Sequence, residues 1–220
     1  MLFRSIVLTY EDKLAKNSDA NILRIPLRNP RILSFFNFVW NIIISSQKCT
    51  VILANGCFLE TWIASFFTRK KYILKIPGDP LWELSRNRAL TSSSIEDFQS
   101  EKLPLRLSIL RLLFNMSLRR ASLIIAPSTQ LRDFCINWGI PPQKVEIIYN
   151  CVDSSRFFPK NGIHRKDIDL VTVCRLVPWK GLEELIFTCS KYDLNLTIIG
   201  SGPLLIELKN LVEELKAKEI

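Results

Sequence analysis

Two cations, Arg175 and Lys180, flank a loop whose position suits phosphate binding. The run V-T-V-C before Arg175 is apolar and β-branched, which predicts a strand, and Pro178 and Gly181 mark a turn into a helix. In a parallel α/β sheet such a loop lies at the carboxyl edge, where ligands bind. A guanidinium and an ammonium beside a helix N-terminus would together bind a diphosphate. The alternative is a pair of solvated surface charges.

A glycine turn follows the next predicted strand, L-N-L-T-I-I. It holds Gly200 and Gly202, and a helix is predicted from Pro203, with Ser201 as a possible cap. The dinucleotide fingerprint G-x-G-x-x-G needs a third glycine where Leu205 stands, so an NAD site is not supported. A loop that approaches another phosphorylated ligand and a simple structural turn both remain open.

Four motifs carry a resemblance to a known family. C-R-L-V-P-W-K-G, I-I-G-S-G-P-L, I-I-Y-N-C-V-D and F-x-P together resemble the retaining GT-B glycosyltransferases of family 4. The resemblance runs from about residue 50 to 218. It implies that Arg175 and Lys180 are catalytic and hold the diphosphate of a nucleotide-sugar, without a metal. The donor-binding residues that it further implies are Gly200, Gly202, Asn150 and Asp153.

Polar side chains after two N-terminal strands form a second candidate region. A-N-G-C-F-L-E and the predicted loop in K-I-P-G-D-P-L-W-E resemble a bacterial branch of the same family. Carboxylates in these loops could bind acceptor hydroxyls, and a tryptophan could stack on a sugar ring. A capping aspartate and a packed tryptophan are the alternative. The acceptor-side candidates are Asn55, Gly56, Asp79, Trp82 and Glu83.

The chain departs from the family pattern at several places. Cys174 and Cys151 stand where the family has glycine, and either would be strained if its backbone needs a positive φ. The opening strand and glycine-rich turn of the family are not evident before residue 50, and no glutamate pair is separated by seven residues. These absences suggest a fragment of a longer protein. The alternative function is therefore a non-catalytic chain that binds a nucleotide or another polyanion.

Charge and cysteine use narrow the class of partner. The net charge of +9 favours an anionic partner such as a nucleotide diphosphate or anionic lipid. No basic aromatic array indicates nucleic-acid binding. The six cysteines form no C-x-x-C pair and the single histidine, His164, lies in a polar stretch, so neither a zinc site nor a cofactor is expected. Free thiols suit a cytoplasmic location, which includes the inner face of the cell membrane.

The alternation of strands and helices predicts the fold class. We expect an α/β protein of GT-B type with two Rossmann-like, doubly wound domains, both incomplete. The first spans 1–152, a polar linker 153–167 follows, and a truncated nucleotide-sugar-binding domain spans 168–220.

Two helices are predicted to be strongly apolar. Residues 31–46 indicate a mostly buried helix. The helix over 104–121 combines arginines with Leu, Ile and Phe, so it either packs on the sheet or forms a peripheral membrane contact. The partners expected are a nucleotide-sugar donor and a glycan or lipid-linked acceptor.

Overall fold

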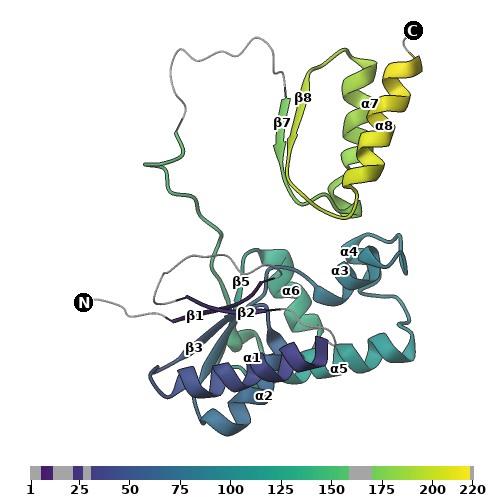
Figure 1. Ribbon diagram of the computed structural model, residues 1–220. Helices are drawn as coiled ribbons and strands as arrows, with labels where there is room; N and C mark the ends of the chain where they lie inside the picture. The colour runs from purple at the N-terminus through teal and green to yellow at the C-terminus, as the bar shows by residue number, and fades with distance from the viewer. Residues whose placement is uncertain (1–5, 12–21, 27–30, 159–169, 219–220) are drawn as a thin grey trace. The chain divides into compact units, whose positions relative to one another are not determined.

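The chain folds into two compact units. The computed structural model describes residues 6–11, 22–26, 31–158 and 170–218. The first unit comprises residues 1–81 and 95–151, and the second comprises residues 82–94 and 152–220 (Figure 1). Both are α/β in class with parallel strands, as the alternating pattern predicts.

A four-stranded parallel sheet forms the centre of the first unit. Its order is β3-β4-β5-β6. The strands are β3 (Ile52–Asn55), β4 (Tyr72–Lys75), β5 (Leu123–Ala126) and β6 (Val145–Ile147). Each is a short apolar run whose inward side chains are almost fully buried, among them Leu74 and Ile124. Because all four strands are parallel, their carboxyl ends meet at one edge of the sheet.

Helices precede the sheet and connect its strands, and parallel pairing requires such connections. They are α1 (Arg31–Ser46), α2 (Phe58–Thr68), α3 (Pro80–Asn87), α4 (Ile95–Phe98), α5 (Leu105–Arg120) and α6 (Thr129–Asn137), and a 3₁₀ turn, η1 (Pro142–Lys144), precedes β6. The hydroxyl of Tyr72 donates to the carbonyl of Ser117 at 2.7 Å, which ties β4 to α5. In the described part of the chain, no helix is both long and apolar enough to cross a bilayer.

Two short strands precede this sheet. β1 (Val7–Glu11) and β2 (Ile22–Pro26) pair in parallel, and α1 packs against them and against α2. The prediction that α1 is mostly buried is wrong: Phe38, Val39 and Ile42 are buried on one side, while the other side is exposed.

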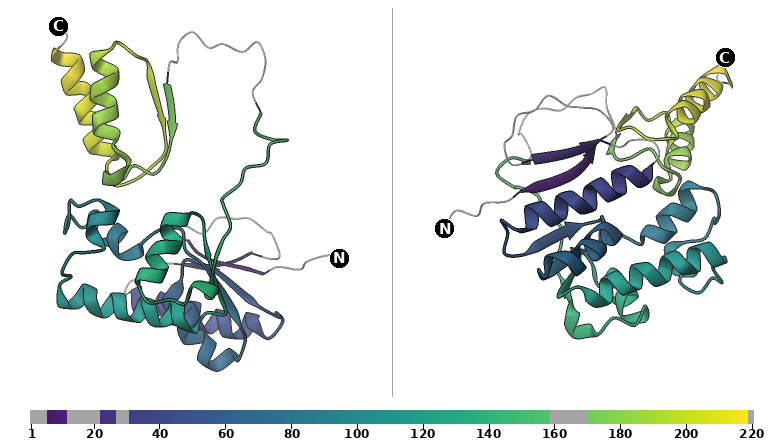
Figure 2. Two further views of the ribbon diagram at one scale, coloured as in Figure 1. Left: turned by 180° about the vertical axis from the view of Figure 1, so that it is seen from behind. Right: turned by 60° about the horizontal axis from the view of Figure 1, so that its bottom comes forward.

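The second unit contains a smaller layer pair. Its elements are β7 (Leu170–Val173), a 3₁₀ turn η2 (Pro178–Lys180), α7 (Leu182–Lys191), β8 (Leu196–Ile199) and α8 (Leu205–Lys218). β7 and β8 pair in parallel, and both helices lie on the same side of them (Figure 2). The core between helices and strands centres on Leu176, Leu182, Ile186 and Leu208. Val173 and Ile199 are exposed.

Candidate functional site

The loop between β7 and α7 presents the two predicted cations. Arg175 follows the strand directly, and Lys180 ends the turn η2. Both residues are exposed, and no carboxylate among the described residues pairs with either. Gly181 then adopts φ 61°, a left-handed conformation that favours glycine, and α7 begins at the next residue. The loop therefore carries two uncompensated positive charges.

Backbone hydrogen bonds hold this loop against the glycine turn after β8. The N–H of Cys174 donates to Ile199 at 3.1 Å, and the N–H of Leu176 donates to Ser201 at 3.0 Å. The N–H of Leu204 returns a bond to Leu176 at 3.2 Å. The Arg175 loop and the 200–202 turn thus lie side by side at the carboxyl edge of β7 and β8.

Both glycines of this turn are required by that close packing. A Cβ on Gly200 would lie 1.9 Å from the carbonyl oxygen of Cys174, and one on Gly202 would lie 2.3 Å from that of Leu176. Neither glycine has a positive φ, so the approach of two backbones is the constraint. This constraint exists without any ligand. The expectation of a Ser201 cap is wrong, since α8 begins only at Leu205.

The N-terminus of α7 contributes less positive potential than a bare helix end would. Gly181 supplies no capping side chain, so the first N–H groups of the helix are not satisfied from that position. Such unsatisfied N–H groups favour an anion, but Glu183 and Glu184 occupy the first turn and oppose an anion there. A diphosphate in this region would therefore depend on Arg175 and Lys180.

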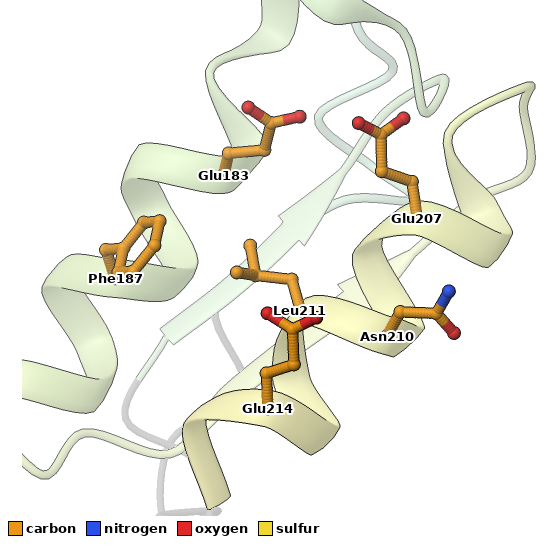
Figure 3. A pocket seen from close by; sticks show the side chains of 6 residues that line it. All are labelled: Glu183, Phe187, Glu207, Asn210, Leu211 and Glu214. Atoms are coloured by element: carbon orange, nitrogen blue, oxygen red, sulfur yellow. The ribbon is translucent and has the colours of Figure 1, made fainter. Parts of the chain in front are cut away.

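A groove of about 370 Å³ lies elsewhere on the second unit, between α7 and α8. Figure 3 shows its lining: Glu183, Phe187, Glu207, Asn210, Leu211 and Glu214. Three carboxylates and no cation line it, so it would repel a diphosphate. We therefore place the candidate donor site at the Arg175 loop and not in the groove.

In the first unit, polar side chains gather at the carboxyl edge of the sheet. Asn55 ends β3 and is the register partner of Lys75, which ends β4. The Nζ of Lys75 donates to Oδ1 of Asn150 at 2.8 Å. Sequence reasoning singled out Asn55 and Asn150 but missed Lys75. Its position at the end of a strand, before P-G-D, was the available signal.

The turn after Asn55 has an unusual backbone. Gly56 has φ 77° and Cys57 has φ 49°, so a cysteine occupies the left-handed region just before α2. Burial, with a smaller contribution from the charge of Glu60, raises the pKa of the Cys57 thiol to about 12. Cys57 is therefore a poor nucleophile at neutral pH.

Of the two roles that the sequence left open for Asp79, acceptor contact and helix capping, the structure supports the capping role. Its side chain is fully buried, and Oδ2 lies 2.7 Å from Nη2 of Arg111. Gln99 donates to the same oxygen at 3.0 Å, and the N–H of Leu81 donates to Oδ1 at 3.0 Å. The indole of Trp138 in turn donates to Gln99 at 2.8 Å. A carboxylate with these partners is unavailable to a sugar hydroxyl.

The prediction that Trp82 and Glu83 lie in a loop is wrong. They belong to the first turn of α3, which begins at Pro80. Proline is favoured at this helix position because its missing N–H needs no partner there. The indole N–H of Trp82 donates to the carbonyl of Ser93 at 3.1 Å.

Asp153 forms a local turn. Its carboxylate accepts from the N–H of Ser155 at 3.0 Å and from the hydroxyl of Ser155, and these bonds lower its pKa. Asn150 belongs to the first unit and Asp153 to the second.

The two cysteines that replace family glycines cause no backbone strain. Neither Cys151 nor Cys174 is among the described residues with positive φ. In the same part of the chain, no group of three potential ligands is placed to hold a metal ion.

Comparison with known proteins identifies the family. The model of Glycosyltransferase Family 4 matches residues 6–156. This chain belongs to Glycosyltransferase Family 4. The match begins at residue 6, so the sequence-based estimate that the resemblance starts near residue 50 is wrong.

A curated relative and two solved structures are similar to this chain. A Campylobacter jejuni N-acetylgalactosamine-N,N'-diacetylbacillosaminyl-diphospho-undecaprenol 4-alpha-N-acetylgalactosaminyltransferase is 35% identical over 114 residues, which cover 50% of this chain and 31% of the relative. Anabaena HepE in complex with UDP is 18% identical with a TM-score of 0.57, over 90% of this chain and 54% of that one. A Rickettsia africae glycosyltransferase is 15% identical with a TM-score of 0.57, over 97% and 57%.

These comparisons support the α/β glycosyltransferase fold of GT-B type. The chain spans about half the length of the two solved structures and about a third of the curated relative. At such identities the structural likeness concerns the fold alone, because one fold hosts many reactions.

Proposed function

We propose that this chain binds the donor and acceptor of a retaining glycosyl transfer, from a nucleotide-sugar to a hydroxyl of a glycan or a lipid-linked glycan. The observation that carries the proposal is the exposed, uncompensated pair Arg175 and Lys180 in a loop held against the 200–202 turn. The UDP complex of HepE supports a nucleoside diphosphate as ligand. The name of the Campylobacter relative supports a diphospho-undecaprenol-linked acceptor.

Charge stabilisation is the proposed catalytic contribution of the loop. As the bond between the sugar and the diphosphate breaks, negative charge grows on the departing diphosphate, and preorganised cations stabilise this larger charge more than the smaller charge of the ground state. Arg175 supplies a planar fork of donors and Lys180 a compact charge. No metal is assigned a role in this proposal.

The polar edge of the first unit is the proposed acceptor side. Asn55 and Asn150 offer amide groups to hydroxyls, and Lys75 fixes Asn150 while it retains further N–H donors. We assign Asp79 no contact with substrate.

Titration of the full chain with UDP tests the donor assignment. Arg175→Ala should weaken binding by about 1.5–3 kcal/mol, the cost of one hydrogen bond to a charged group. Lys180→Ala should act in the same direction. The matched control is Lys209→Ala, which removes an exposed cation from α8 of the same unit and should leave affinity unchanged.

Two results would contradict the assignment of Arg175 and Lys180 to diphosphate binding. One is an unchanged UDP affinity in Arg175→Ala and Lys180→Ala, and the other is an equal loss of affinity in Lys209→Ala. UDP binding that depends on both cations without any sugar transfer would favour the alternative, a nucleotide-binding chain that is not catalytic.

A further inference from the structure

The solvent side of α1 carries an apolar stripe, with Asn37 exposed beside it. Phe38, Val39 and Ile42 fill the core, yet Leu33, Phe36, Trp40 and Ile44 on the opposite side recur at helical spacing and are exposed. Trp40 is 61% exposed. A helix on the surface of a soluble protein normally presents polar side chains there. This face is therefore built for an apolar environment.

α5 repeats the pattern. Its exposed stripe comprises Leu105, Ile109, Leu112 and Met116, again at helical spacing, while its opposite side is buried. α2 lies between α1 and α5 and contacts both (Figures 1 and 2). It adds two exposed phenylalanines near its end, Phe66 and Phe67. We call these exposed residues of α1, α2 and α5 the apolar face.

The charges around the apolar face are almost all positive. α1 and α5 contain no acidic residue, and α2 contains only Glu60. Exposed cations lie on the three helices or within three residues of their ends: Arg31, Lys48, Arg69, Lys71, Lys102, Arg106, Arg119 and Arg120. The guanidinium of Arg120 lies 4.1 Å from the ring centroid of Phe66 and donates to Ser65, which joins cation and apolar surface directly.

We propose that the apolar face docks peripherally on an anionic lipid bilayer. Exposed aromatic and aliphatic side chains would enter the boundary between headgroups and acyl chains, and the surrounding cations would bind the anionic headgroups. A second copy of this chain would have to place like charges of both copies opposite each other, which disfavours self-association. The inference does not depend on glycosyl transfer, although it would place the proposed acceptor site near a lipid-linked acceptor.

Co-sedimentation of the full chain with vesicles tests the proposal. We expect binding to vesicles of phosphatidylcholine with about 30% phosphatidylglycerol, weaker binding at high salt, and at least about tenfold weaker binding for the double variant Phe36→Gln/Trp40→Gln. The matched control is Phe187→Gln/Ile206→Gln, which removes two exposed apolar side chains from the second unit and should bind like the wild type. Circular dichroism would verify that both variants are folded.

A spectroscopic readout locates the contact. Brominated lipid should quench tryptophan emission of the bound chain, and Trp40→Phe should lose much of that quenching while it still binds. Retained quenching in Trp40→Phe would overturn the assignment of this face. Absence of vesicle binding by the folded wild type, or a dimer that the α1 double variant dissolves while vesicle binding is unchanged, would also overturn it.

Discussion

Replacing Asp79 by alanine should destabilise the chain severely. The substitution leaves the guanidinium of Arg111, only 14% exposed, without the carboxylate now 2.7 Å away. Breaking a buried ion pair from one side costs about 3–5 kcal/mol. The same carboxylate accepts from the N–H of Leu81 at the start of α3, and a lost cap costs about 1 kcal/mol. Because one side chain makes both contacts, we expect about 3–5 kcal/mol in total.

Urea unfolding of the full chain measures this loss. Total stabilities of about 5–15 kcal/mol leave room for the difference to be resolved. Trp138 is a local reporter, since Arg111 lies 4.7 Å from its ring centroid. The control is Asp133→Ala: this exposed carboxylate lies 3.6 Å from Arg132, and such surface pairs contribute less than about 1 kcal/mol.

The double variant Asp79→Ala/Arg111→Met separates the ion pair from the other contacts. Removing both charges should recover part of the stability lost in Asp79→Ala, because the uncompensated buried cation is gone. A loss below about 1 kcal/mol in Asp79→Ala would refute the reasoning, since breaking a buried pair from one side should cost more than an exposed pair contributes. A double variant Asp79→Ala/Arg111→Met that is no more stable than Asp79→Ala would also refute the reasoning.

Two further predictions concern other parts of the chain. Gly200→Ala should lower the free energy of unfolding by about 1–3 kcal/mol or more, because its Cβ meets the backbone of Cys174. The control, Ser201→Ala at the exposed neighbouring position, should leave the free energy of unfolding unchanged, and equal urea midpoints for the two variants would contradict the prediction. In alkylation followed by mass spectrometry at pH 8, exposed Cys151 should react first, while Cys57 and Cys135 remain thiols because burial raises the pKa of each to about 12. Rapid native labelling of Cys57 would contradict the second prediction, and in urea all should react.

The sequence predicted elements well where apolar spacing was regular. The helix over 31–46 and the helix expected after Gly181 match α1 and α7, because their core residues recur every three to four positions. It failed at α3, whose eight residues carry little apolar periodicity and whose start depends on Asp79 and Pro80. Burial of Asp79 was also out of reach, because its partner Arg111 is 32 residues away in the sequence. Long-range pairs of this kind leave no local pattern.

The departure from the family at position 174 is explained by where the close approach occurs. The backbones of the two loops nearly touch at Gly200, which meets the carbonyl of Cys174, and this is why position 200 excludes a side chain. Position 174 has no such restriction: its φ is not positive, and its side chain packs against the core that contains Leu176. A side chain there adds apolar contact without moving the backbone that carries Arg175. The chain can therefore replace this glycine and keep the loop geometry on which the donor proposal depends.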